Sequence, residues 1–212
     1  MEKKRFIFDL DRTLLTCNYR LVETAIFEPI FKEKTNYLMD NIGKMLDEYE
    51  TIHNKYDDEE LSKYLTNISG LEFTPEIIKG WKSSMTTDSE ADVMEEGVIE
   101  LLEHLKSKNK SLVVLTNWYG ESQIARLKNA KIYDYFDDVF TGEYQLKPHP
   151  EAYIRAMDKY DPRECVMIGD CIYKDYHAPR LHGIEAILYD KDDVHTKEYV
   201  KVKSLNDFKK KY

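Results

Sequence analysis

From Val93 onwards, short apolar segments alternate with segments of helical periodicity, and this alternation restricts the fold more than any other feature of the sequence. The apolar segments that we interpret as strands are residues 111–115, 138–140, 165–168 and 186–189. The segments that we interpret as helices are residues 95–108, 120–129, 150–159, 175–182 and 205–210. Short apolar strands that alternate with helices require a parallel sheet covered on both faces. We therefore predict an α/β fold: a parallel sheet with helices on both faces.

A further apolar run, residues 6–8, has the right length for a strand buried in this sheet, and two carboxylates follow it. Asp9 and Asp11 are two positions apart, so both side chains point to the same side of an extended chain. Two like charges about 4 Å apart repel each other by roughly 4 kcal/mol at an effective dielectric of about 20. A chain that places them together needs a cation, a shared proton or a catalytic reason for doing so.

Residues 17–92 interrupt the pattern, because they show helical spacing and no convincing strand. One predicted helix spans residues 59–68 and ends near Gly70, and another begins at residue 74, with Pro75 in its first turn. We therefore predict two domains. Residues 1–16 and 93–212 form the α/β core, and residues 17–92 form an inserted bundle of helices.

Charge and composition exclude several classes of protein. The chain of 212 residues has a net charge of −9, and residues 17–92 hold sixteen acidic and eight basic residues. This acidity argues against nucleic acid as a partner, since phosphate contacts need a basic face. No apolar run approaches the roughly 18 residues of a membrane span, so we expect no membrane insertion. The three cysteines show no Cys-x-x-Cys spacing, which predicts free thiols and a cytoplasmic location.

Polar residues follow each of several predicted strands, at the point where the strand ends. They are Asp9 and Asp11, Thr116 and Asn117, Lys147 at the end of a loop that follows residues 138–140, and Asp170 with Asp175 five residues later. The carboxyl ends of parallel strands lie on one edge of the sheet, where open α/β sheets bind their ligands. We therefore expect these side chains to converge in one cleft.

The residue types in this set suit phosphate chemistry. Asp9, Asp170 and Asp175 supply hard oxygen ligands of the kind that Mg²⁺ prefers. The Thr116 hydroxyl and the Lys147 ammonium suit phosphate oxygens. A carboxylate beside a divalent ion can attack phosphorus once the repulsion between anions is offset. A second carboxylate, such as Asp11, can then move protons.

Four motifs in this order resemble those of the haloacid dehalogenase superfamily, and specifically its phosphatase branch. They are Asp9-Leu-Asp11-Arg-Thr13, then Thr116-Asn117, then Lys147-Pro-His-Pro150, and finally Gly169-Asp170 with Asp175. The helical insert directly after the first motif is similar to the helical cap of many members. The resemblance implies a Rossmann-like core, Mg²⁺ as cofactor and a small phosphorylated metabolite as substrate.

The resemblance also implies a role for each residue. Asp9 is the expected nucleophile, forming an aspartyl-phosphate, and Asp11 the expected proton donor and acceptor, with Thr13 supporting their loop. Thr116, with Asn117, and Lys147 are expected to bind the phosphoryl group. The expected metal ligands are Asp9, the backbone carbonyl of Asp11, Asp170 and Asp175, the last directly or through water.

Three other functions stay open at this point. A phosphomutase of the β-phosphoglucomutase type uses the same groups but returns the phosphoryl group to a sugar. A dehalogenase needs neither a metal nor an acid at position 11, so the presence of Asp11, Lys147 and Asp170 argues against it. A non-catalytic binding module is disfavoured by the intact motifs. The sequence also leaves open the substrate, the oligomeric state, and whether Trp118 and Tyr119 line the pocket or pack under the cap.

Overall fold

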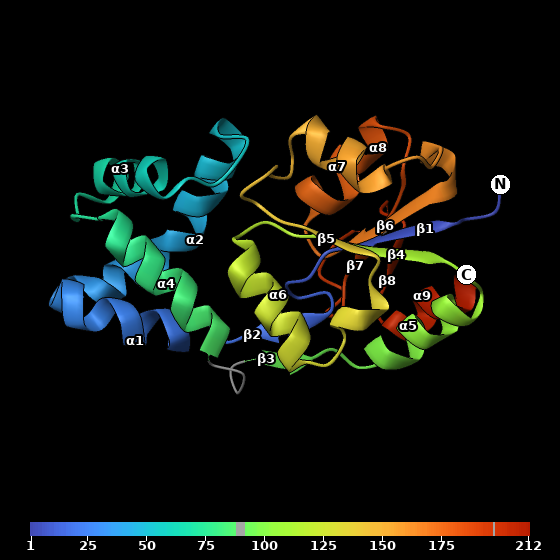
Figure 1. Cartoon of the computed structure of the whole chain (residues 1–212), viewed down its shortest axis with the longest axis horizontal. Coiled ribbons are helices and arrows are strands. Elements are labelled where there is room, and N and C mark those ends of the chain that lie inside the picture. Colours follow the sequence, from blue (N-terminus) through green and yellow to red (C-terminus); the bar gives the residue numbers. More distant parts are fainter. Residues whose placement is uncertain (88–91, 197) are drawn as a thin grey trace.

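The computed structural model describes residues 1–87, 92–196 and 198–212 and contains a six-stranded parallel sheet (Figure 1). The strand order is β5-β4-β1-β6-β7-β8, and every neighbouring pair is parallel. The strands are β1 (Arg5–Phe8), β4 (Ser111–Leu115), β5 (Asp138–Phe140), β6 (Cys165–Gly169), β7 (Glu185–Tyr189) and β8 (Lys201–Val202). The predicted fold class is confirmed. The edge strand β8, only two residues long, was not predicted.

Helices cover both faces of the sheet, as Figure 1 shows. On one face, α5 (Val98–Ser107) and α9 (Leu205–Lys211) pack on a cluster that includes Phe6 and Phe8. On the other face, α7 (Pro150–Met157) and α8 (Ala178–Leu181) pack on a cluster that includes Ile7. Successive residues of a strand point to opposite faces. The run Phe6-Ile7-Phe8 therefore supplies both cores, which explains why these three consecutive residues of β1 are apolar.

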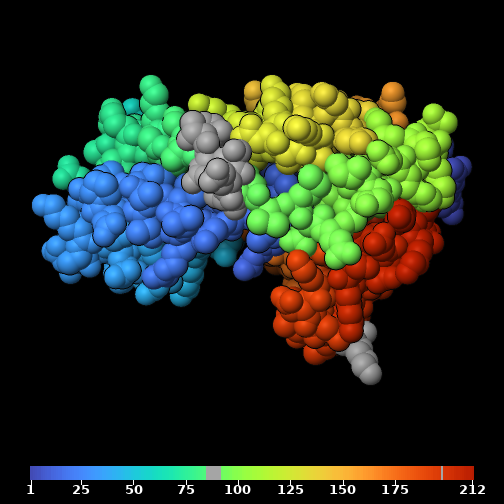
Figure 2. Space-filling view, turned by 90° about the horizontal axis from the view of Figure 1, so that it is seen from below, coloured from blue at the N-terminus to red at the C-terminus, as the bar shows by residue number. Residues whose placement is uncertain are grey.

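The inserted segment folds into a group of helices that we call the helical unit, residues 19–87. Its elements are α1 (Tyr19–Phe31), η1 (Lys32–Lys34), α2 (Thr35–Ile52), α3 (Asp58–Ser69) and α4 (Pro75–Thr87). Gly70 ends α3 with a positive φ of 71°, and Pro75 begins α4, as predicted. Phe27 and Trp81 are buried at its centre. Figure 2 shows this unit, coloured blue to teal, as a lobe at one end of the molecule.

A short antiparallel ribbon links the helical unit to the sheet. Its strands are β2 (Leu15–Cys17) and β3 (Asp92–Met94). The expectation that residues 17–92 contain no strand was therefore wrong at both ends of that segment. The equally short β5 was predicted because it lies within the alternation of strands and helices, whereas β2 and β3 lie at the two junctions with the inserted helices, where their pairing reveals them.

Several predicted helices have different limits in the structure. The predicted helix 175–182 is instead a π-helix, η4 (Ile172–His177), followed by α8. The predicted helix 95–108 begins only at Val98, after Gly97 with its φ of 85°. The periodicity of residues 150–159 predicts that Tyr153, Ile154 and Met157 face the sheet, yet Ile154 is exposed. The remaining elements are α6 (Gly120–Asn129), η2 (Tyr133–Tyr135) and η3 (Pro162–Glu164). None of the described helices has the length and apolar character needed to cross a membrane.

The first prediction compares two apolar helix residues with opposite burial. Leu102 of α5 is 0% exposed, whereas Ile154 of α7 is 55% exposed. Leu102→Ala should lower the free energy of unfolding by about 2–5 kcal/mol, because it leaves a cavity in the core. Ile154→Ala should change it by less than about 0.5 kcal/mol. Urea unfolding followed by circular dichroism measures both, and equal losses would contradict the described packing of α7.

Candidate active site

The carboxyl ends of β1, β4 and β6 open into a cavity of about 470 Å³ beneath the helical unit. Every residue that the sequence analysis singled out for binding or catalysis lines this cavity. They are Asp9, Asp11, Thr116, Asn117, Lys147, Asp170 and Asp175. The volume falls within the range of roughly 300–1,000 Å³ that is usual for small-molecule sites. The polar residues near the strand ends therefore lie together in one cavity, as expected.

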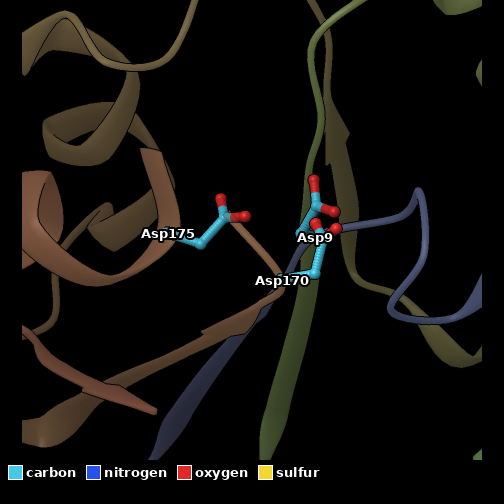
Figure 3. Close-up of side chains that lie close together, drawn as sticks. All are labelled: Asp9, Asp170 and Asp175. Carbon is cyan, nitrogen blue, oxygen red and sulfur yellow. The ribbon is translucent and has the colours of Figure 1, made fainter. Parts of the chain in front are cut away.

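Three carboxylates form a compact group at the floor of the cavity. One oxygen each from Asp9, Asp170 and Asp175 lies within 4.8 Å of the others. Figure 3 shows Asp175 reaching from η4 toward Asp9 and Asp170, which follow neighbouring strands β1 and β6. Oxygen donors from carboxylates are the set that Mg²⁺ prefers, so these residues fit that ion. The side chain of Asp11 is not in this group.

Local backbone geometry puts Asp175 in this position. The Asp175 backbone N–H donates to the Cys171 carbonyl at 2.8 Å, and the Cys171 N–H donates to Asp175 Oδ2 at 3.0 Å. The carboxyl group lies directly over Gly169, where an added Cβ atom would meet Asp175 Cγ at 2.4 Å. Only glycine therefore fits at position 169, because any side chain would displace Asp175.

Lys147 lies between two of these carboxylates. Its Nζ is 2.6 Å from Asp9 Oδ1 and 2.7 Å from Asp175 Oδ1, and the residue is 2% exposed. The Asn117 amide fixes the backbone of Lys147 from both sides. Asn117 Nδ2 donates to the Lys147 carbonyl at 2.9 Å, and the Lys147 N–H donates to Asn117 Oδ1 at 2.8 Å. In this structure Asn117 thus positions the lysine.

The charges in this cluster do not balance. Burial raises the pKa of Asp9 well above its usual value, Lys147 opposes this, and the carboxylates of Asp175 and Asp170 add to it. Burial, together with Asp175, also raises the pKa of Asp170, to about 7. A buried group of carboxylates around one ammonium carries excess negative charge, which a divalent cation would neutralise.

Asp11 belongs to a separate hydrogen-bonded network. Arg126 Nη1 lies 2.7 Å from Asp11 Oδ1, Gln123 Nε2 donates to Asp11 Oδ2 at 3.0 Å, and the Tyr19 hydroxyl also donates to Asp11. Burial acts to raise the pKa of Asp11, but Arg126 and the hydrogen bonds from Tyr19 and Gln123 lower it below its usual value. Arg126 Nη2 also pairs with Asp92 of β3 at 2.8 Å. This network therefore joins Asp11 to the ribbon and to α1.

We did not predict these partners of Asp11 from the sequence, although the spacing of two of them on one helix could have indicated them. Gln123 and Arg126 are three positions apart on α6, so they share one helix face. That helix follows the Thr116-Asn117 strand end directly, which places its first turns at the same edge of the sheet. Gln123 Nε2 also donates to the Thr116 hydroxyl at 2.8 Å.

The side chains of Trp118 and Tyr119 settle an alternative that the sequence left open. Trp118 has a φ of 81°, lines the cavity, and packs on Trp81 with 4.5 Å between ring centroids. Trp118 therefore both lines the pocket and packs against the helical unit. Tyr119 is buried and stacks on Tyr56 at 5.2 Å, in the core of the helical unit, and is not among the lining residues.

Curated proteins that resemble this chain include several phosphatases. A ribulose-1,5-bisphosphate 5-phosphatase from Halopiger xanaduensis is 32% identical over 95 residues, or 43% of this chain and 40% of the relative. A phosphoglycolate phosphatase from Thiobacillus denitrificans is 29% identical over 42% of this chain and 40% of the relative. A glyceraldehyde 3-phosphate phosphatase from Pyrococcus furiosus is 24% identical over 49% and 47%. The matched part thus spans less than half of each relative.

Solved structures with the same fold match nearly the whole chain. A HAD phosphatase from Thermococcus onnurineus superposes with a TM-score of 0.71, at 18% identity, over 99% of this chain and 97% of that chain. L-2-haloacid dehalogenase from Xanthobacter autotrophicus gives a TM-score of 0.73, at 16% identity, over 98% and 97%. At such identities the likeness shows the fold alone. The family model for haloacid dehalogenase-like hydrolases matches residues 6–189, and the chain belongs to this family.

Proposed function

We propose that this protein is a phosphomonoester hydrolase that acts on a small phosphorylated metabolite through an aspartyl-phosphate on Asp9. One observation carries the proposal: buried Lys147 lies between Asp9 and Asp175, beside Asp170, at the floor of a cavity. A lysine and several carboxylates around one point suit the transfer of a doubly charged phosphoryl group. The phosphatase names of the curated relatives agree with this reaction class.

The reaction has two steps in this proposal. In the first, an Asp9 carboxylate oxygen bonds to phosphorus, the ester P–O bond breaks, and Asp11 gives a proton to the leaving alcohol oxygen. Because Arg126 lowers the pKa of Asp11 in the arrangement described above, this step requires Asp11 to separate from Arg126 and take up a proton when the substrate is bound. In the second, water attacks the phosphorus, Asp11 takes a proton from that water, and the Asp9–phosphate bond breaks to release inorganic phosphate. Asp11 leaves the first step without its proton, which suits it to act as the base in the second.

The residues around Asp9 bind and orient the phosphoryl group. Lys147 would offer its ammonium to the phosphoryl oxygens, with Thr116 as a neutral donor. Asp9, Asp170, Asp175 and the Asp11 backbone carbonyl would hold Mg²⁺. When bound, this ion reduces the repulsion between the carboxylates and the phosphate dianion.

The helical unit would serve as the lid of the site. We propose that residues 17–92 form a cap domain over a catalytic core of residues 1–16 and 93–212. Support comes from the cavity, which is lined by both parts of the chain, and from the ribbon of β2 and β3, through which the chain enters and leaves the cap. A closed lid excludes water that would weaken the electrostatic interactions of the site.

The second prediction concerns the nucleophile. Asp9→Asn should lower phosphate release from p-nitrophenyl phosphate on the order of 10³-fold or more, because an amide does not replace the attacking carboxylate. The circular dichroism spectrum should stay that of the wild type. Asp134→Asn makes the same change at an exposed residue of η2 and should keep the wild-type rate. A turnover of Asp9→Asn close to that of the wild type would contradict the assignment.

The same assay separates the phosphatase from the phosphomutase. A hydrolase releases inorganic phosphate from hexose phosphates without net isomerisation. Isomerisation of a hexose phosphate without phosphate release would instead show that a sugar hydroxyl takes the place of water.

The third prediction concerns the buried ammonium. Lys147→Met should lower the free energy of unfolding in metal-free buffer by about 3–5 kcal/mol, because Asp9 and Asp175 lose their common cation. Lys63→Met is the matched control, since Lys63 pairs with Glu59 on an exposed helix face and should cost less than about 1 kcal/mol. Chemical denaturation measures both. Equal stability of Lys147→Met and the wild type would refute the role of Lys147 as a counter-ion.

The fourth prediction concerns the metal. Mg²⁺ at about a hundred times its dissociation constant should stabilise the wild type by about 2.7 kcal/mol. Asp170→Asn should reduce this stabilisation because one of the three clustered carboxylates is lost. Thermal unfolding with and without Mg²⁺ provides the measurement, and EDTA should stop phosphate release. Full stabilisation of Asp170→Asn by Mg²⁺ would place the ion elsewhere.

A further inference from the structure

The end of the cavity formed by the helical unit has a different character from the phosphoryl end. Trp81 of α4 lines it together with Trp118 and the aliphatic side chains of Met39, Ile42 and Leu46 from α2. Aromatic faces and aliphatic side chains provide few partners for a highly hydrated group. This wall therefore suits the carbon frame of a leaving alcohol.

Two carboxylates of the helical unit, Glu23 and Glu50, interrupt this apolar wall, and Glu50 is paired with Lys174. Glu23 of α1 lines the cavity and is only 9% exposed. The Trp81 indole N–H donates a hydrogen bond to it. Burial raises the pKa of Glu23 to about 7, while the bond from Trp81 acts in the opposite direction. A buried carboxylate is costly unless it has a counter-ion.

The basic residues of the cavity wall are already paired with other carboxylates. Arg20 pairs with Asp40 at 2.7 Å. Lys174 pairs with Asp47 at 2.6 Å and also with Glu50.

Nearer the floor, Arg12 lies 3.9 Å from Asp170, and Lys147 is held by Asp9 and Asp175. Within residues 1–87, 92–196 and 198–212, Glu23 has no ion pair. Among the described residues of this wall, Glu23 is therefore the carboxyl group without a cationic partner, and a bound cation would favour its charged form.

A protonated amine would complete this arrangement. It would place a positive charge beside Glu23, in a cavity wall that Trp81 and Trp118 also line, and aromatic rings attract cations. A second carboxylate or phosphate at this position would instead be repelled by Glu23 and stripped of its water. A hydroxyl would form a hydrogen bond but leave the charge of Glu23 uncompensated.

We propose that the substrate is a phosphomonoester of an amino alcohol, whose ammonium group binds to Glu23 in the part of the cavity wall that Trp81 also lines. This inference rests on the proposed hydrolase function and names the substrate class for that site. Glu23 would then determine specificity, while Asp9 and Lys147 act on the phosphoryl group that all such esters share.

A matched series of substrates tests the proposal. The series consists of straight-chain alkyl phosphates with two to six carbons that end in an ammonium, a hydroxyl or a carboxylate group. Varying the length finds the ester that reaches Glu23. At the best length, kcat/KM should be about tenfold or more higher for the ammonium ester than for the hydroxyl ester, and the carboxylate ester should be the poorest.

Glu23→Gln keeps the size of the side chain and removes its charge. The ratio of kcat/KM between ammonium and hydroxyl esters should fall toward one, mainly through a higher KM for the ammonium ester. Glu28→Gln is the control, because Glu28 is an exposed residue of the same helix, and it should keep the wild-type ratio. An unfolding curve of Glu23→Gln that matches the wild type shows that the fold is unchanged.

The outcomes separate this proposal from the one on which it rests. If wild-type protein hydrolyses the series but prefers hydroxyl or carboxylate esters, or if Glu23→Gln keeps the ammonium preference, the amino-alcohol inference is overturned and the hydrolase function stands. If no phosphate ester, p-nitrophenyl phosphate included, releases phosphate in the presence of Mg²⁺, both are overturned.

Discussion

The ion pairs of Lys147 with Asp9 and Asp175 are the interaction on which the site depends. They join three separate parts of the chain: the end of β1, the loop before α7, and the π-helix η4. Buried charges are tolerated only when they are paired, so this contact fixes the distance between the parts. Asn117 holds the lysine backbone, and Gly169 leaves room for Asp175. The ends of β1, β4 and β6, the loop before α7 and the helix η4 therefore meet at one point, where the proposed phosphoryl transfer takes place.

A second network connects this point to the helical unit. Arg126 contacts Asp11 at the site and Asp92 in the ribbon, and Tyr19 at the start of α1 donates to Asp11 as well. The carboxylate proposed to move protons is thus bound to the segments through which the chain enters and leaves the helical unit. Any movement of α1 relative to the sheet would change the partners of Asp11. In the proposed mechanism this couples lid position to the proton carrier.

The sequence predicted the parallel sheet, the inserted helices and the family, and all three are confirmed. Apolar runs and helix end signals are local, so they can be recognised one segment at a time. The ribbon of β2 and β3 was not predicted because its strands are distant in the chain and pair only with each other, which no local pattern shows. The inward orientation of Ile154 was wrong because periodicity identifies the apolar positions of a helix but not the exact face that contacts the sheet. The roles of the site residues and the two-domain boundaries stay predictions.

The sequence by itself determined which chemical groups this protein brings to one sheet edge, since each follows a strand and parallel strands end on the same side. Only the tertiary structure decided how these groups are paired. Lys147 is shared between Asp9 and Asp175, whereas Asp11 is held apart by Arg126. In the sequence, Glu23 likewise looks like an ordinary helix residue. In the structure, the packing of α1 against α4 buries it beside Trp81. Pairing and burial depend on contacts between residues distant in the chain, and no local pattern contains them.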